Sequence, residues 1–128
     1  MNILIVEDDE AFSKKLERTV SECLKYSFVN CAATVDDAVS QISVIPYDVI
    51  SVDANIPLAA QDIVDPEKYY GNIVIQHAKN LKKAHRNYVI ACSDDISHLS
   101  GYDKSFPKTN FNIIKYIECI KQFEQKNK

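Results

Sequence analysis

The sequence contains little glycine: only Gly71 and Gly101 occur among its 128 residues. A phosphate loop of the kind that binds nucleotides or flavins places several glycines close together between a strand and a helix. No G-x-G-x-x-G pattern or other glycine-rich stretch follows any strand-like run of this chain. A nucleotide- or flavin-binding domain is therefore a remote interpretation of the sequence.

Long apolar segments and closely spaced cysteines are absent as well. Met1 and Asn2 lead directly into a short apolar run, so the sequence predicts neither a signal peptide nor a transmembrane helix. The four cysteines are widely scattered and form no C-x-x-C pair: Cys23, Cys31, Cys92 and Cys119. This distribution predicts reduced, buried thiols in a cytoplasmic protein.

The charge balance excludes a further class of partner. The formal net charge of -3 at pH 7 argues against direct binding to nucleic acid or to an anionic membrane surface. The length predicts one domain over residues 1–128, large enough to bury a core. No low-complexity tract is present that would serve as an interdomain linker.

Strand-like and helix-like segments alternate along the chain. Short apolar, β-branched runs predict strands at residues 3–6, 28–32, 48–53 and 88–92, with a weaker strand at 104–106. Apolar residues at helical spacing predict helices within 12–24, 35–42, 73–81 and 113–120. This alternation predicts a doubly wound parallel α/β sheet with right-handed crossovers and helices on both faces.

Asp53 stands at the carboxyl end of the third predicted strand. Pro57 follows shortly afterwards and cannot continue a sheet ladder, so the strand must end near Asp53. In open parallel α/β sheets, ligands bind at the edge formed by the carboxyl ends of the strands. A single carboxylate at this position is ambiguous, because an aspartate also simply ends a strand.

Other charged and polar residues follow the remaining strands. Glu7, Asp8 and Asp9 follow the first strand, Ser93, Asp94 and Asp95 the fourth, and Lys108 the weak fifth. Crowded carboxylates repel one another unless a cation intervenes, and oxygen ligands without histidine or cysteine select Mg²⁺ or a similar ion. Together with a lysine and a hydroxyl group, these carboxylates are typical of a phosphoryl site. Aspartate is also a nucleophile that forms aspartyl phosphates.

The runs Ile3–Asp9 and Val52–Pro57, combined with Ser93 and Lys108, resemble the receiver domain of two-component response regulators. The resemblance covers nearly the whole chain. It implies a flavodoxin-like sheet of five parallel strands in the order 2-1-3-4-5. It also implies that Asp53 accepts a phosphoryl group from a histidine kinase or a histidine phosphotransfer protein, with Mg²⁺ or Mn²⁺ as the cofactor.

The same resemblance assigns the metal ligands. Glu7 and Asp8 match the acidic pair that binds the metal in this family, and Asp53 itself contributes a carboxylate oxygen. The backbone carbonyl of Asn55 matches a further ligand. Asp9 does not match a ligand and is expected to be the N-cap or first-turn acid of the following helix.

The residues around the phosphoryl group are also implied by the resemblance. Ser93 matches the hydroxyl residue that binds a phosphoryl oxygen, although a plain loop-starting serine is the alternative. Lys108 matches the lysine that pairs with the phosphoryl group, with Lys104 as the rival for that position. Asn55 and Asp95 fall at positions that influence the lifetime of the phosphoryl group in this family.

Two intervals depart from the family pattern. The interval from Asp53 to Ser93 is longer than usual, and the surplus lies at residues 58–71, where the family has a tight glycine turn. The interval from Ser93 to Lys108 is shorter than usual, so the fourth helix should be reduced to a turn or two near 96–100, or be absent.

Smaller departures lie beside Lys108. Ser105 occupies the place of the family's switch aromatic, and Phe106 comes one residue later, which should turn its ring to the opposite face of the strand. Thr109 stands where a proline is usual. These changes affect elements that normally transmit the signal rather than the residues that carry the chemistry.

Two functions follow as expectations. The first is a cytoplasmic phosphorelay receiver, not an enzyme with a separate substrate, that switches an interaction with an unknown output protein or domain, or forms a homodimer. The second is a receiver-like module that binds a partner without phosphorylation. Neither interpretation includes direct contact with nucleic acid or a membrane.

Overall fold

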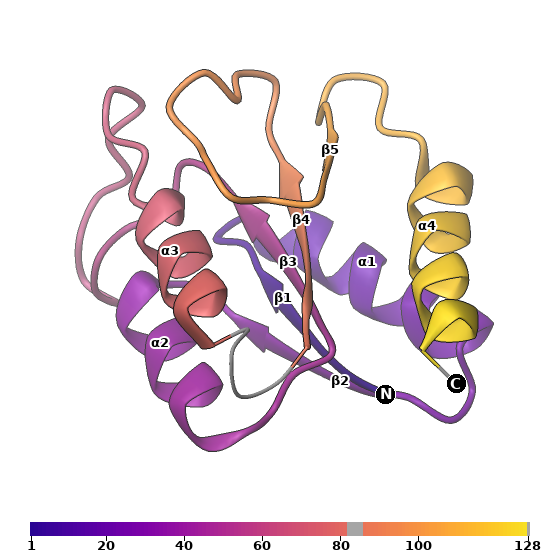
Figure 1. Ribbon diagram of the computed structural model, residues 1–128. Coiled ribbons are helices and arrows are strands. Elements are labelled where there is room, and N and C mark those ends of the chain that lie inside the picture. Colours follow the sequence, from indigo (N-terminus) through magenta and orange to yellow (C-terminus); the bar gives the residue numbers. More distant parts are fainter. Residues whose placement is uncertain (82–85, 128) are drawn as a thin grey trace.

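Five parallel strands form one twisted sheet in the computed structural model, which describes residues 1–81 and 86–127 (Figure 1). The strands lie in the order β2-β1-β3-β4-β5. Their bounds are β1 (Asn2–Val6), β2 (Phe28–Ala32), β3 (Val49–Asp53), β4 (Tyr88–Cys92) and β5 (Lys104–Phe106). The predicted doubly wound sheet and its strand order are confirmed.

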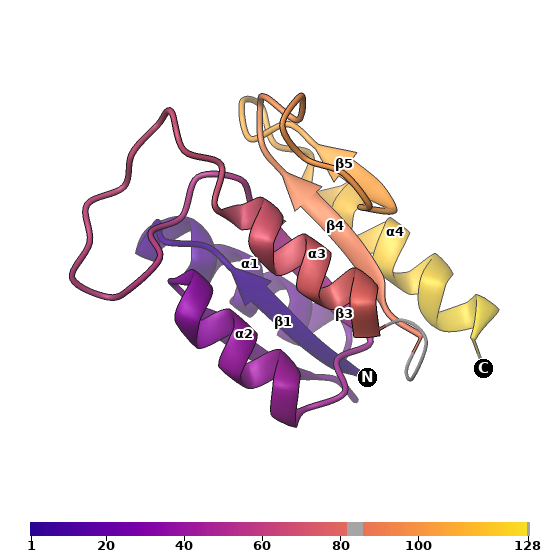
Figure 2. The same cartoon turned by 60° about the vertical axis from the view of Figure 1, so that its left-hand side comes forward.

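Four helices flank the sheet within the described residues. They are α1 (Glu10–Cys23), α2 (Val35–Val44), α3 (Gly71–Leu81) and α4 (Ile113–Lys126). The helices α2 and α3 cover one face, and α1 and α4 cover the other (Figures 1 and 2). Asp9 immediately precedes α1, and its side chain accepts a hydrogen bond from the backbone N–H of Phe12, as an N-cap does. The predicted capping role of Asp9 is confirmed.

Apolar side chains fill both sides of the sheet because its central strands are covered on both faces. Residues of β1, β3 and β4 are buried almost completely and contribute alternately to the two core clusters. The cysteines are all free, but Cys23 is exposed, Cys31 and Cys119 are partly buried, and only Cys92 is buried. The prediction of buried thiols is therefore wrong for Cys23, which ends α1 three residues beyond Val20, the last buried residue of that helix.

The connection between β4 and β5 contains no helix, and all of it lies within the described residues. Leu99 is buried against the cluster beneath α2 and α3, and Ile96 and Tyr102 pack against the same cluster. The side chain of Gln76 on α3 donates to the backbone carbonyl of Ser100 at 2.7 Å. The helix that the resemblance to receivers would place between β4 and β5 is therefore absent, as the short interval from Ser93 to Lys108 predicts.

The connection between β3 and α3 is long and irregular, as predicted, and ends where α3 approaches the sheet very closely. The backbone N–H of Gly71 donates to the carbonyl of Ala54 at 2.9 Å. A Cβ atom at Gly71 would lie only 2.1 Å from the carbonyl oxygen of Asp53. Only glycine fits at this helix start, which connects the position of α3 directly to that of Asp53.

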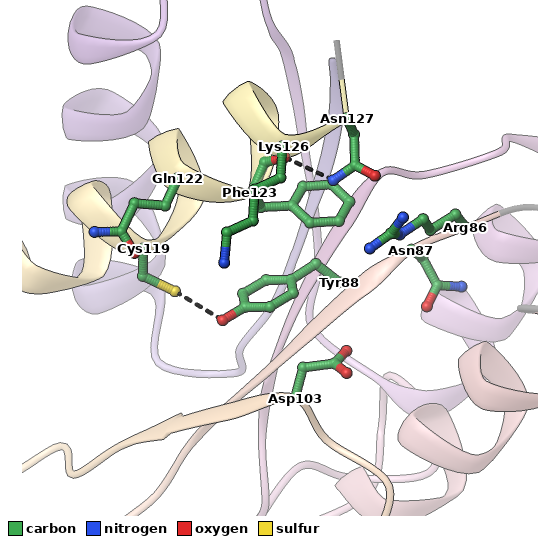
Figure 3. Close-up of a pocket in the computed structure, with 9 residues that line it drawn as sticks. All are labelled: Arg86, Asn87, Tyr88, Asp103, Cys119, Gln122, Phe123, Lys126 and Asn127. Atoms are coloured by element: carbon green, nitrogen blue, oxygen red, sulfur yellow. Dashed lines mark hydrogen bonds between the residues drawn. The ribbon is translucent and has the colours of Figure 1, made fainter.

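A hollow of about 450 Å³ lies at the amino-terminal edge of β4, between this strand and the end of α4 (Figure 3). The ring of Tyr88 stacks on that of Phe123 with their centroids 5.1 Å apart, and the Cys119 thiol donates to the Tyr88 hydroxyl. None of the residues predicted for the phosphoryl site lines this hollow.

Among the described residues, no helix combines the length and the apolar character needed to cross a membrane.

Candidate functional site

Three carboxylates gather at the carboxyl edge of the sheet because β1 and β3 are neighbours and run in the same direction. Glu7 follows β1, and its backbone N–H extends the ladder to the carbonyl of Ala32 at 2.9 Å. Asp53 is the last residue of β3 and is only 6% exposed. One oxygen each from Glu7, Asp8 and Asp53 lies within 4.8 Å of the other two. The predicted metal ligands are thus brought together.

Lys108 provides the counter-charge for this cluster. Its Nζ lies 2.6 Å from Oε1 of Glu7 and 3.4 Å from Oδ2 of Asp53, and 5.0 Å from the centroid of the Phe12 ring. Lys104 is exposed at the beginning of β5, where it pairs with Ile90 in the middle of β4. The structure therefore places Lys108, and not Lys104, beside Asp53.

The electrostatics of the cluster leave it short of positive charge. Burial, reinforced by the neighbouring Asp53, raises the pKa of Glu7 to about 8, although Lys108 acts in the opposite direction. Burial also raises the pKa of Asp53, against the influence of Glu7 and Lys108. A single ammonium group cannot neutralise three neighbouring carboxylates, so a divalent cation would relieve their repulsion.

The donor set fits a hard cation such as Mg²⁺ or Mn²⁺. All three side-chain ligands are carboxylates, and neither histidine nor cysteine lies among them. The backbone N–H of Asn55 donates to Oδ1 of Asp53 at 3.3 Å, which places the Asn55 backbone beside the same carboxylate. The role of the Asn55 carbonyl as a ligand stays a prediction.

Ser93 and Asp95 lie on the other side of Asp53, after β4. The hydroxyl of Ser93 is buried, donates to the backbone carbonyl of Asp95 at 3.0 Å and accepts from the Asp95 N–H at 3.3 Å. A hollow of about 490 Å³ opens above these residues. The residues predicted for the phosphoryl group and its lifetime all line it: Asp53, Asn55, Ser93, Asp95 and Lys108.

The side chains of Asn55 and Asp95 bind neighbouring loops in this structure. Asn55 donates through Nδ2 to the carbonyl oxygens of Pro66 and Lys68 in the long β3–α3 connection. Asp95 accepts from the hydroxyl of Tyr69 in the same connection, at 3.3 Å. The influence of Asn55 and Asp95 on a phosphoryl group stays a prediction, but both residues connect the site to the enlarged loop.

A contact between Asp94 and Thr109 positions Lys108 and was missed by sequence reasoning. The backbone N–H of Thr109 donates to Oδ1 of Asp94 at 2.8 Å, and its hydroxyl donates to Oδ2 at 2.7 Å. A proline at position 109 would lack this N–H. The signal for the contact was the departure from proline at position 109, but the partner could not be read from the sequence.

Thr109→Val is expected to raise the pKa of Asp94 toward its ordinary value, and Thr109→Pro is expected to raise it further. The backbone and hydroxyl bonds from Thr109 are the main causes that hold this pKa low, and valine removes only the second. The stability supplied by these bonds is fully present above the ordinary pKa of an aspartate, and it is lost as the pH falls through the lowered pKa of Asp94. Titration of the aspartate carboxyl resonances by NMR measures the shift, and an unchanged Asp94 pKa in both variants would contradict it.

The ring of Phe106 lies on the face of the sheet that its position, one residue after Ser105, predicts. Its ring lies in the cluster beneath α1 and α4, 5.7 Å from the ring of Tyr116 and 6.3 Å from that of Phe111. Ser105 pairs with Ala91, whose side chain lies on the opposite face of the sheet, beneath α2 and α3. Ser105 shares that face. The ring of Phe106 is thus a core residue on the opposite face from Ser105, as predicted.

Comparisons with known proteins agree with the architecture. The sequence matches no protein-family model and no curated protein. In structure, the chain is similar to the receiver domain of a Francisella response regulator, with a TM-score of 0.75 and 21% identity over 99% of this chain and 98% of that one. It is also similar to a CheY-like receiver domain protein from Methanospirillum hungatei, with a TM-score of 0.73 and 20% identity over 98% and 95% of the two chains.

A third similar structure carries ligands. It is a response regulator protein from Burkholderia pseudomallei, described with a phosphorylated aspartic acid, a calcium ion and citrate, with a TM-score of 0.60 and 18% identity over 84% of this chain and 59% of that one. The fold and the acidic edge together define a doubly wound α/β protein with a carboxylate cluster at its ligand-binding edge. More specifically, the chain has the fold of response regulator receiver domains over nearly its whole length.

Proposed function

We propose that the protein is a receiver that accepts a phosphoryl group on Asp53. One observation carries the proposal: Asp53 ends β3 within 4.8 Å of the Glu7 and Asp8 oxygens and 3.4 Å from the ammonium of Lys108. A nucleophilic carboxylate, two further hard ligands and a fixed cation together suit phosphoryl transfer. The receiver fold of the chain supports this assignment.

In the proposed reaction, an Oδ atom of Asp53 attacks the phosphorus of a phosphohistidine on a kinase or phosphotransfer protein. The new P–O bond forms as the P–N bond breaks, and the histidine nitrogen leaves with the electron pair. Lys108 then pairs with the phosphoryl oxygens, and the Ser93 hydroxyl donates to one of them. When bound by Glu7, Asp8, Asp53 and the Asn55 carbonyl, Mg²⁺ or Mn²⁺ supplies charge neutralisation at these oxygens.

The phosphoaspartate and the calcium ion described for the Burkholderia protein support this chemistry by analogy. The proposed partners are a histidine kinase or a histidine phosphotransfer protein in the cytoplasm, and an output protein or domain whose interaction changes on phosphorylation, including a second copy of this chain. The protein then takes up and loses its phosphoryl group by itself, without acting on a separate substrate.

A receiver-like module that binds its partner without phosphorylation is the second candidate function. The elements that normally transmit the signal depart from the family pattern and favour this alternative: no helix joins β4 to β5, and Phe106 is a core residue of the sheet. Partner binding that Asp53→Asn and Asp53→Glu both leave unchanged would support this alternative.

Incubation with acetyl phosphate and Mg²⁺ is expected to add one phosphoryl mass to the wild type and none to Asp53→Asn, because asparagine lacks the nucleophilic oxygen. Intact-mass spectrometry measures the gain. Glu118→Gln serves as the control, since it alters an exposed carboxylate on α4 that does not line the hollow around Asp53. An unmodified wild type, or equal gains in wild type and Asp53→Asn, would refute the proposed function.

A further inference from the structure

The enlarged β3–α3 connection reaches across the hollow that contains Asp53. Pro66 and Tyr69 of this connection line that hollow together with Asp53. Asn55, two residues after Asp53, donates through its side chain to the carbonyl oxygens of Pro66 and Lys68, at 3.3 and 3.1 Å. These bonds hold the last part of the connection above the carboxyl edge of the sheet.

Tyr69 joins this connection to the one between β4 and β5. Its ring stacks on the imidazole of His98, with centroids 4.3 Å apart and an interplanar angle of 18°. Its hydroxyl donates to Oδ2 of Asp95 at 3.3 Å. Both connections rise from the same edge of the sheet, at the top of Figure 1. Two loops that are far apart in sequence therefore meet on one side of the hollow.

Asp95 is held by this contact and by its own loop. Its Oδ1 accepts from the backbone N–H of Ser97 at 3.0 Å and from the Ser97 hydroxyl at 2.6 Å, while Oδ2 accepts from Tyr69. Both carboxylate oxygens of Asp95 are thus engaged, as is the amide of Asn55. A water molecule beside Asp53 would have to compete with the Tyr69 hydroxyl for Oδ2 of Asp95. Asp9 and Asp94, which line the same hollow, are exposed.

We propose that Tyr69 is a positioning residue that keeps water away from phosphorylated Asp53 and so lengthens the lifetime of the phosphoryl group. The inference rests on the proposed phosphorylation of Asp53. Loss of the group requires water to attack phosphorus: a new P–O bond forms, the bond from phosphorus to the Asp53 oxygen breaks, and the water proton passes to a base or to solvent. The Tyr69 ring occupies one side of the space above Asp53, and its hydroxyl holds Asp95, a candidate base, in place.

The experiment follows the decay of the phosphorylated protein after removal of acetyl phosphate, by intact mass. Tyr69→Ala should raise the first-order decay rate about tenfold, because both the ring and the bond to Asp95 are lost. Tyr69→Phe should raise it only about threefold, since the ring remains and partly rescues the function. The rate of phosphorylation by acetyl phosphate should stay within about twofold, because the bonds that hold Asp53, from Asn55 and Lys108, do not involve Tyr69.

Ile63→Ala is the matched control, since Ile63 lies in the same connection and is 92% exposed. Its decay rate should equal that of the wild type. Equal decay in wild type and Tyr69→Ala would overturn the role of Tyr69 while leaving phosphorylation of Asp53 intact. A parallel loss of phosphorylation rate in Tyr69→Ala would indicate general disruption and would also overturn it. A wild type that takes up no phosphoryl group would overturn the proposed function and this inference together.

Discussion

Gly71→Ala is expected to lower the free energy of unfolding by about 3 kcal/mol or more, because the added methyl group has no space. The Cβ would lie 2.1 Å from the Asp53 carbonyl oxygen and 2.9 Å from the Cα of Ala54. Both neighbours are backbone atoms at the end of a buried strand, so they cannot turn aside as a side chain can. Helix α3 would have to move away and lose the hydrogen bond from the Gly71 N–H to Ala54.

Urea denaturation measures the loss, and Gly101→Ala is the control. A Cβ at Gly101 would meet only the flexible side chain of Lys79, and its positive φ of 87° should cost about 1–2 kcal/mol for alanine. Gly71→Ala should also slow phosphorylation by acetyl phosphate, since the displaced backbone carries Asp53. A loss at Gly71 no larger than the loss at Gly101 would show that the helix start tolerates a side chain.

The strands and the acidic edge were predictable from sequence because each depends on local patterns. The runs at 28–32, 88–92 and 104–106 match the observed strands β2, β4 and β5 residue for residue. Parallel strands bring their carboxyl ends to one edge, which is why Glu7 and Asp53 could be predicted to meet. The choice between Lys108 and Lys104 stayed open in the sequence, and the observed bounds of β5 decide it, since Lys108 follows the strand and Lys104 begins it.

The contacts made by loops were not predictable, because they join segments whose separation in space depends on the whole fold. The pairing of Thr109 with Asp94 and the stacking of Tyr69 on His98 both connect different loops. The length of the β3–α3 connection was visible in the sequence, but its attachment by Asn55 was not. The exposure of Cys23 likewise depends on where α1 ends rather than on the apolar residues around it.

Lys108→Met is expected to lower the free energy of unfolding by about 2–3 kcal/mol when no divalent cation is present. The substitution removes the ammonium that lies 2.6 Å from Glu7 and 3.4 Å from Asp53. It leaves the buried Asp53, together with Glu7 above its raised pKa of about 8, without a counter-charge. The loss should be smaller than for a fully enclosed pair, because the Lys108 side chain is 27% exposed and partly screened by water. Chemical denaturation in the presence of a chelator measures this loss.

Mg²⁺ should offset much of this loss, because a cation that binds the folded protein stabilises it in proportion to its affinity for that state. Removal of the ammonium also removes a charge that repels the metal, so Mg²⁺ should raise the thermal unfolding midpoint of Lys108→Met more than that of the wild type. Lys104→Met is the matched control, since Lys104 is exposed, does not line the hollow around Asp53 and should affect neither quantity. Equal responses of the two lysine variants to Mg²⁺ would contradict the expected repulsion between Lys108 and the cation, and no response in either variant would mean that the cation does not bind among Glu7, Asp8 and Asp53.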